Sequence, residues 1–176
     1  YPGQAGLSVG LRYIESKRYL NTIDLKMVEI SDGSMHMEHK TKCNIIQDFA
    51  KSFKVISEVG SKDASINISS ENWIKWVKNE LNAGSWKVIA EAREGGNVGI
   101  CNDDGGIKSE LIDEITKSIS NDKILWEAPK KDQQIYFIEK FGANVNLGNI
   151  APDGIIPLEC LRLGLRGDTF HNFLKK

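Results

Sequence analysis

The chain has 176 residues, of which 40% are hydrophobic and 27% charged, and its net charge is −1. This length and composition predict one soluble globular domain spanning residues 1–176. The balanced charge argues against nucleic acid as an obligatory partner, and since no apolar run approaches ~18 residues we expect no membrane span.

Short apolar runs recur along the chain, and each carries a glutamate at or beside its C-terminal end. The runs KMVEI, KVISE, KVIAE and ILWE contain Glu29, Glu58, Glu91 and Glu127, respectively. They are rich in Val and Ile and too short for helices, so the sequence predicts strands. We expect these strands at about 26–30, 54–59, 87–92 and 123–127, with a fifth in NVNLGNI at about 144–148.

Stretches with helical spacing of apolar residues separate these runs. In SSENWIKWVKNELNAG, Ser70 is the expected N-cap and Gly84 the stop. The other expected helices lie in NIIQDFAKSF (44–53), SELIDEITKSI (109–119), QQIYFIEKFG (133–142) and LECLRLGL (158–165). We expect Trp73, Trp76 and Trp86 to lie on or beside a helix and to pack against the sheet.

Alternation of strands and helices indicates an α/β protein with a parallel sheet. A doubly wound sheet usually has a G-x-G-x-x-G turn after its first strand, which this sequence lacks. A (β/α)8 TIM-type barrel gathers the C-terminal ends of its strands at one rim, so the repeated carboxylates favour the barrel. Because such a barrel has eight strands in about 250 residues, about three N-terminal strands are either omitted from this sequence or absent from a truncated or rearranged barrel.

The segments that follow the strands are the candidate site. They are EISDGS, EVGSKD, EAREGG, EAPKK and NLGNI. Clustered carboxylates repel one another unless a cation joins them, and oxygen ligands suit Mg²⁺. Lys62 and Arg93 suit an anionic substrate, and Arg93 can bind a carboxylate or phosphate through two hydrogen bonds. The alternative is that the glutamates form structural salt bridges in the barrel mouth.

Two other polar segments are weaker candidates. In HMEH, His36 and His39 resemble a metal-binding pair, but we expect them to lie on a solvated loop. The glycine-rich segment REGGNVGICNDDGG is explained equally well as an anion-binding backbone or as a mobile rim loop. Cys43, Cys101 and Cys160 form no C-x-x-C pair, which is typical of reduced thiols and predicts a cytoplasmic protein.

Six segments together resemble the phosphosulfolactate synthase family: VEISDGS, SEVGSKD, VIAEARE, WEAPKKDQQIYFI, NVNLGNI and LECLRLGLRGDTF. The resemblance runs from about Met27 to Phe170. It implies a (β/α)8 barrel and a carbon–sulfur lyase that adds sulfite to phosphoenolpyruvate with Mg²⁺, giving (2R)-2-phospho-3-sulfolactate. In that family the step serves coenzyme M or sulfolactate biosynthesis. YPGQAGLS is similar to the family's opening segment, which would place the missing strands between about Gly10 and Tyr19.

The implied reaction suggests roles for individual residues, and the resemblance itself points to Lys62. Lys62 would be the general acid that protonates the carbon bearing the phosphate, with its pKa lowered by neighbouring cations and burial. Arg93, Asn149 and Arg166 are candidates for contacts with phosphate, carboxylate or sulfite. Glu29, Glu58, Glu91 and Glu127 are the candidate Mg²⁺ ligands, and the metal would stabilise an aci-carboxylate formed after sulfite attack. We further expect a homo-oligomer.

Two alternative functions stay open at this point. One is a non-catalytic barrel homologue with a binding or stress-protection role, which the intact EVGSKD and EARE segments argue against. The other is a magnesium-dependent lyase acting on a different enolpyruvate or 2-oxo acid, because residue types alone do not identify a sulfite site.

Overall fold

The computed structural model describes residues 11–32, 37–63 and 65–173. Its strands are β1 (Met27–Ile30), β2 (Lys54–Val59), β3 (Ser85–Ala90), β4 (Ile124–Glu127) and β5 (Leu147–Gly148). Its α-helices are α1 (Leu11–Thr22), α2 (His39–Phe49), α3 (Ser70–Asn82), α4 (Ser109–Ser118), α5 (Lys131–Phe141), α6 (Ile155–Arg162) and α7 (Gly167–Phe170). Single turns of 3-10 helix lie at Asn121–Lys123, Pro152–Gly154 and His171–Phe173.

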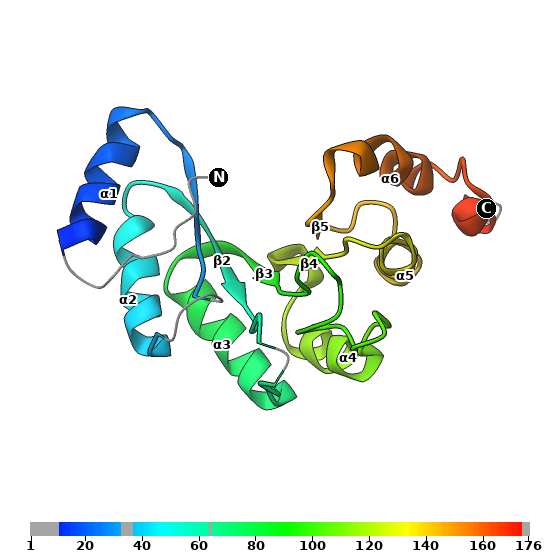
Figure 1. Cartoon of the computed structure of the whole chain (residues 1–176), viewed down its shortest axis with the longest axis horizontal. Coiled ribbons are helices and arrows are strands. Elements are labelled where there is room, and N and C mark those ends of the chain that lie inside the picture. The colour runs from blue at the N-terminus through cyan, green and yellow to red at the C-terminus, as the bar shows by residue number, and fades with distance from the viewer. Residues whose placement is uncertain (1–10, 33–36, 64, 174–176) are drawn as a thin grey trace.

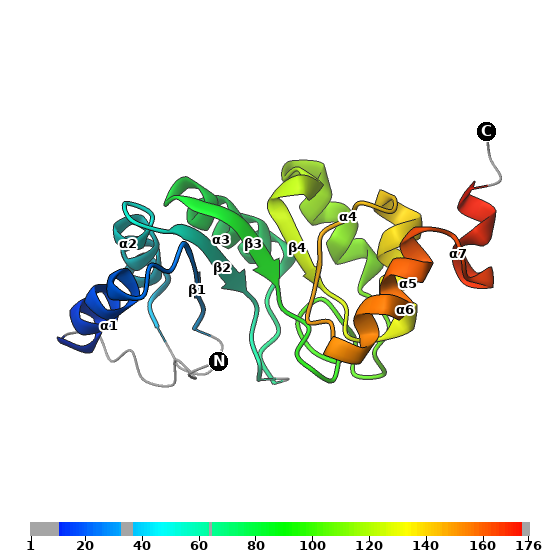
Figure 2. The same ribbon diagram turned by 90° about the horizontal axis from the view of Figure 1, so that it is seen from above.

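The strands form one parallel sheet whose order follows the chain, from β1 to β5. Figure 2 shows the strands pointing the same way, so the loops that follow them gather at one edge of the sheet. This confirms the predicted α/β class with a parallel sheet. In the part of the chain that the structure describes, β1 and β5 are the sheet's edges, so the sheet is open and no barrel closes.

The helices cover one face of the sheet and bury the core there. Figure 1 shows α2, α3 and α4 side by side along this face, with α1 and α6 towards its two ends. Outward-facing strand residues such as Val55, Val88 and Trp126 are buried against these helices. Alternate strand residues point to opposite faces, so the glutamates at the strand ends lie on the face that these helices leave uncovered.

Helix α3 shows how local sequence sets an element. The Ser69 hydroxyl accepts a hydrogen bond from the Asn72 amide at 3.3 Å and caps the helix one residue earlier than expected. Trp73 and Val77 lie four residues apart and are both buried against the sheet. The chain leaves the helix at Gly84, whose φ of +114° suits glycine.

Two side chains lie elsewhere than the sequence predicted. His39 is the first residue of α2, five residues before the expected helix, and its ring stacks on Trp76 at 5.6 Å, so it does not lie on a solvated loop. The prediction followed apolar spacing, which the polar first turns of α2 lack. Trp86 belongs to β3 and is 39% exposed, with the Lys54 ammonium 3.6 Å from its ring centre. His36 lies outside the described residues.

The two ends of the chain add smaller corrections. Strand β5 covers two of the five expected residues, Leu147 and Gly148, which are the two that pair with β4. The missing strands were expected between about Gly10 and Tyr19. Gly10 lies outside the described residues, and the rest of this interval belongs to α1. None of the helices in the described ranges is long and apolar enough to span a membrane. All three cysteines are free thiols.

Candidate active site

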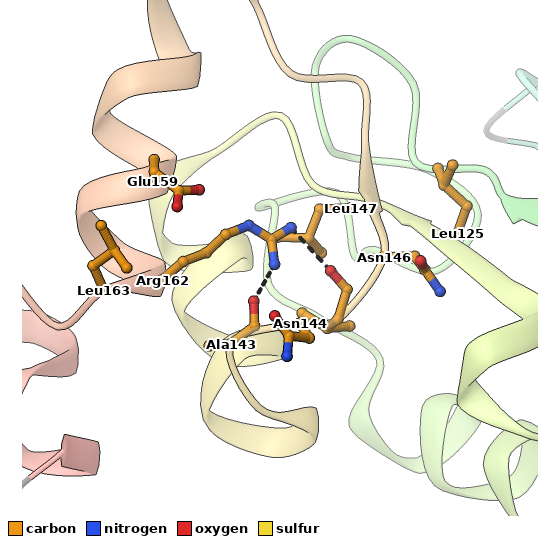
Figure 3. Close-up of a pocket in the computed structure, with 9 residues that line it drawn as sticks. Leu125, Ala143, Asn144, Asn146, Leu147, Glu159, Arg162 and Leu163 are labelled. Carbon is orange, nitrogen blue, oxygen red and sulfur yellow. Dashed lines mark hydrogen bonds between the residues drawn. The ribbon is translucent and has the colours of Figure 1, made fainter.

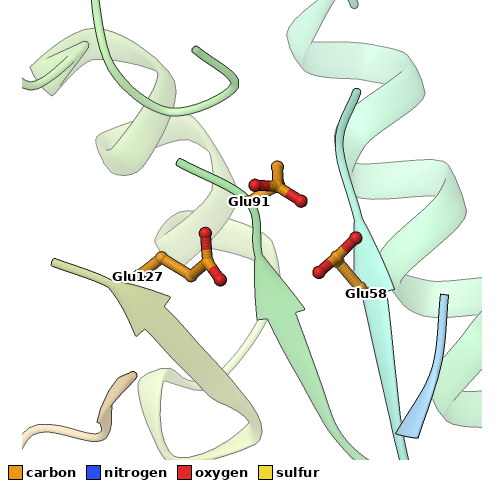
Figure 4. A group of neighbouring side chains, drawn as sticks. All are labelled: Glu58, Glu91 and Glu127. Carbon is orange, nitrogen blue, oxygen red and sulfur yellow. The ribbon is translucent and has the colours of Figure 1, made fainter. Parts of the chain in front are cut away.

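Three strand ends bring their glutamates into one cluster. Glu58 is the last residue but one of β2, Glu91 follows β3 directly, and Glu127 ends β4. One carboxylate oxygen of each lies within 4.8 Å of the others, and Figure 4 shows the three carboxylates turned towards one another. Glu58 and Glu91 are buried and Glu127 is half-buried. The parallel sheet therefore converts three separate sequence segments into one acidic site.

Ionisation of the clustered carboxylates is unfavourable in the metal-free fold. Burial, followed by repulsion from Glu58 and Glu127, raises the pKa of Glu91 to about 9. Burial also raises the pKa of Glu58. Within the described residues, Glu58 Oε1 and Glu91 Oε2 are buried oxygens with no hydrogen-bond partner. Such oxygens are normally satisfied in a folded protein, so the site as built calls for a cation or a shared proton.

Backbone amides orient the remaining oxygens. The N–H groups of Ala92 and Arg93 donate to Glu127 Oε2 at 2.8 and 2.9 Å. The Arg93 amide also donates to Glu91 Oε1 at 2.6 Å. Arg93 itself adopts the left-handed region, with φ of +64°. Sequence reasoning missed these donors, because no residue type announces a backbone amide.

The free oxygens suit a divalent cation. Glu58 Oε1 and Glu91 Oε2 accept no hydrogen bond within the described residues, and the backbone amides bind only one oxygen of Glu127. Mg²⁺ prefers carboxylate oxygens, together with water and substrate oxygens, over nitrogen or sulfur ligands. The donor set therefore fits the predicted metal, with Glu58, Glu91 and Glu127 as the residues that would hold it.

Lys62 lies beside the two unpartnered oxygens. Its ammonium nitrogen is 3.9 Å from Glu58 Oε1 and 3.8 Å from Glu91 Oε2. Burial lowers the pKa of this ammonium, but attraction by Glu58, Glu91 and the other two rim glutamates outweighs burial, so its pKa is raised. The expected lowering by neighbouring cations is wrong for the metal-free protein, because the nearest charged groups are carboxylates.

The other candidate residues differ in how close they come to the cluster. Glu29, near the end of β1, lies on the same face of the sheet. Burial and the Glu58 charge raise its pKa, but its oxygens lie outside the group of three carboxylates. The Arg93 side chain is exposed and donates to the Lys62 carbonyl at 3.3 Å. Asn149 follows β5 at the same edge of the sheet, with φ of +56°. Arg166 precedes α7, a helix that contacts α5 and α6, and its side chain makes no capping hydrogen bond there.

The glycine-rich loop after β3 is held in place by a buried side chain. Gln133 of α5 donates to the carbonyl oxygens of Gly96 and Gly105 at 2.8 and 2.9 Å. Its own amide oxygen accepts a hydrogen bond from the Lys130 amide at 3.1 Å. The loop is therefore anchored to the helix that follows Glu127.

A hollow of about 470 Å³ lies away from the carboxylates. Figure 3 shows it between the segment that leads into β5 and helix α6, with Arg162 donating to the carbonyls of Ala143 and Val145. Those carbonyls precede β5 and so lie at the N-terminal ends of the strands. The guanidinium is thus engaged by backbone, and the chemistry-bearing groups lie at the opposite edge of the sheet.

The chain is similar to known proteins over most of its length. A family model described as (2R)-phospho-3-sulfolactate synthase (ComA) matches residues 9–168. A phosphosulfolactate synthase of Bacillus subtilis (strain 168) is 45% identical over 89% of this chain and 63% of its own length. One from Methanothermobacter thermautotrophicus is 41% identical over 84% of this chain and 59% of its own length. One from Methanocaldococcus jannaschii is 40% identical over 97% of this chain and 70% of its own length. The chain thus spans about three fifths of the first two relatives.

Proposed function

Because the chain belongs to the (2R)-phospho-3-sulfolactate synthase (ComA) family, we propose that the protein adds sulfite to phosphoenolpyruvate and forms (2R)-2-phospho-3-sulfolactate. One observation supports this most strongly: the carboxylates of Glu58, Glu91 and Glu127 meet at the strand ends with Lys62 beside them. A carbon–sulfur bond forms at the methylene carbon, and a proton is added at the carbon that bears the phosphate.

The reaction places negative charge on the substrate carboxylate. A Mg²⁺ ion held by Glu58, Glu91 and Glu127 would act as the Lewis acid that stabilises this charge. Glu127 is oriented for this role by the amides of Ala92 and Arg93. The Arg93 guanidinium is exposed at the same rim, where it can bind an anionic oxygen of the substrate.

In this proposal Lys62 supplies the proton. Its raised pKa keeps the ammonium protonated at neutral pH, which a proton donor requires. Positive charge placed between Glu58 and Glu91 would offset the attraction that raises this pKa and would make the proton easier to transfer. In this proposal Lys62 stays protonated in the empty site and releases its proton more easily once a cation is bound.

We also propose that the protein's sheet closes into a (β/α)8 barrel. The five described strands are parallel, neighbours in chain order, and covered by helices on one face, as in such a barrel. The edges β1 and β5 offer unpaired backbone groups to further strands.

The proposed reaction is tested by incubating the purified protein with phosphoenolpyruvate, sulfite and Mg²⁺ in deuterated water. We expect phosphosulfolactate, detected by phosphorus NMR and mass spectrometry, with one deuterium at the carbon bearing the phosphate. Folded protein that binds Mg²⁺ but leaves both substrates unchanged would contradict the proposal and favour a non-catalytic binding role. Product from another enolpyruvate, with none from phosphoenolpyruvate, would favour the other lyase.

A further inference from the structure

A buried ion network lies on the opposite side of β2 from the carboxylate cluster. The Lys42 side chain is 2% exposed, and its ammonium lies 2.8 Å from Asp32 Oδ1 and 2.9 Å from Glu80 Oε1. Glu80 is fully buried in α3. The ammonium also donates to the Glu58 backbone carbonyl. One lysine of α2 thus joins the loop after β1, the end of β2, and α3.

Within the described residues, the sheet leaves the carbonyl that Lys42 binds unpaired. Pairing between β1 and β2 ends at Ile30 and Ser57, one residue before Glu58. The next carbonyl, that of Val59, accepts from the Glu91 amide on the β3 side. Carbonyls alternate in direction along a strand, so the Glu58 carbonyl points towards the β1 side, beyond the last β1–β2 pair. The Lys42 ammonium replaces the missing ladder hydrogen bond.

Packing alone does not explain so much buried charge. A buried ion pair is often no more stabilising than apolar side chains of similar volume, because both charges lose their hydration. What the network adds is a fixed position for Glu58, whose carboxylate stands on the other face of β2. It also anchors Asp32, in the loop that follows β1 at the C-terminal ends of the strands.

We propose that Lys42 is a positioning residue for the carboxylate cluster: by holding the Glu58 carbonyl and Asp32, it sets the place of the Glu58 carboxylate and so the affinity of the cluster for a divalent cation. The inference rests on the proposed metal site, and it concerns cation binding whether or not sulfite is the substrate. Removal of an outer partner of a metal ligand typically weakens metal binding by about 10- to 100-fold.

The test measures Mn²⁺ binding by electron paramagnetic resonance, with Mg²⁺ as competitor. Lys42→Met alone leaves Glu80 buried without a counter-charge, so the informative variant is Lys42→Met/Glu80→Gln, which removes both charges and keeps the volume. We expect this variant to unfold near the wild-type temperature and to bind Mn²⁺ about 10- to 100-fold more weakly. Lys17→Met is the matched control. It breaks the ion pair of Lys17 with Asp48 of α2, the helix that also carries Lys42, and it should leave Mn²⁺ affinity unchanged.

A second variant decides the matter if the double variant does not fold. Asp32→Asn keeps the Lys42–Glu80 pair but weakens the anchor of the ammonium, and it should bind Mn²⁺ several-fold more weakly. Wild-type Mn²⁺ affinity in Asp32→Asn, or in a folded double variant, would overturn the proposal. A wild-type protein that binds no Mn²⁺ would overturn it together with the metal site. Mn²⁺ binding without phosphosulfolactate formation would remove the proposed reaction and leave the role of Lys42 standing.

Discussion

The Lys62 ammonium lies 3.9 and 3.8 Å from two carboxylate oxygens that have no hydrogen-bond partner in the described part of the chain. A lysine in that position can serve as a counter-charge or as a proton donor. The two roles differ in what they need, because a counter-charge needs only positive charge, whereas a donor must release its proton during the reaction. Substitutions at this one residue therefore separate them.

Lys62→Ala should lower kcat by about 10²- to 10⁴-fold, the range usual for loss of a general acid. Phosphoenolpyruvate binding should weaken much less, because Arg93 and the metal still hold the anion. Lys62→Arg keeps the charge but releases no proton at neutral pH, so it should be as impaired as the alanine variant. Steady-state kinetics measure both, and a fully active Lys62→Arg enzyme would assign Lys62 to charge balance alone.

The pH dependence of stability follows from the carboxylate cluster. Glu91 has a pKa of about 9 in the metal-free fold against 4.5 in its ordinary state, because burial disfavours its charge. Between these two values the folded state keeps a proton that the unfolded state has released. The stability of the metal-free protein should therefore fall as pH rises from 4.5 to about 9.

Denaturant unfolding at a series of pH values, with and without Mg²⁺, measures this slope. Mg²⁺ binds the ionised carboxylates, so saturating Mg²⁺ should remove most of the fall. Glu91→Gln cannot ionise and should flatten the metal-free curve. A metal-free wild-type protein that becomes more stable across this interval would show that Glu91 is already ionised in the fold.

Sequence could predict which carboxylates meet, but not their electrostatics. Glu58, Glu91 and Glu127 were identifiable because each ends an apolar run and all strand ends share one edge. The direction of the Lys62 pKa shift depends on which charges come within about 4 Å of the ammonium, and spacing along the chain does not determine that. The role proposed for Arg166, which precedes α7, stays a prediction.

At the scale of elements, two glycines let neighbouring segments approach Glu91. A Cβ added to Gly60, after β2, would lie 2.3 Å from Glu91 Cβ. A Cβ added to Gly99, in the loop after β3, would lie 1.9 Å from the Glu91 carbonyl oxygen. Both glycines have positive φ. The ends of β2 and β3 can therefore bring their carboxylates together only because these positions lack side chains.

Gly99→Ala should weaken Mn²⁺ binding by roughly tenfold or more, because Glu91 or the loop must move to admit the methyl group. Gly142→Ala is the matched control, since Gly142 also has positive φ, at +90°, but has no atom within 4 Å of an added Cβ. The control should lose about 1–2 kcal/mol of stability from backbone strain and keep its Mn²⁺ affinity. Equal Mn²⁺ affinity in the two variants would mean that contact with Glu91 at position 99 does not matter.

Element boundaries were predictable where apolar residues mark them. Strands β1 to β4 begin and end within about two residues of the expected positions, a difference within the usual uncertainty of element ends. The first turns of α2 were missed because Lys42 occupies a buried position with a charge. A lysine four residues before the buried Ile46 was the available signal, though most lysines at such positions are exposed.

At the scale of the whole molecule, chain order in the sheet creates the site. Each strand lies beside the strand that precedes it, so glutamates about one β–α unit apart in sequence become neighbours in space. Alternation of strands and helices also allowed a doubly wound sheet, and the carboxylates at the strand ends favoured this strand order. Closure of the sheet does not follow from this order, because it depends on what pairs with β1 and β5, and within the described residues these are edges.

The most direct test of the account is an anomalous-difference map from crystals of the protein grown with Mn²⁺ in place of Mg²⁺. We predict one strong peak bonded to carboxylate oxygens of Glu58, Glu91 and Glu127, with Lys62 beside it and the Glu29 oxygens farther away. Glu127→Gln should weaken or abolish this peak. A map with no peak between the three glutamates, from protein that forms phosphosulfolactate under the same conditions, would contradict the account.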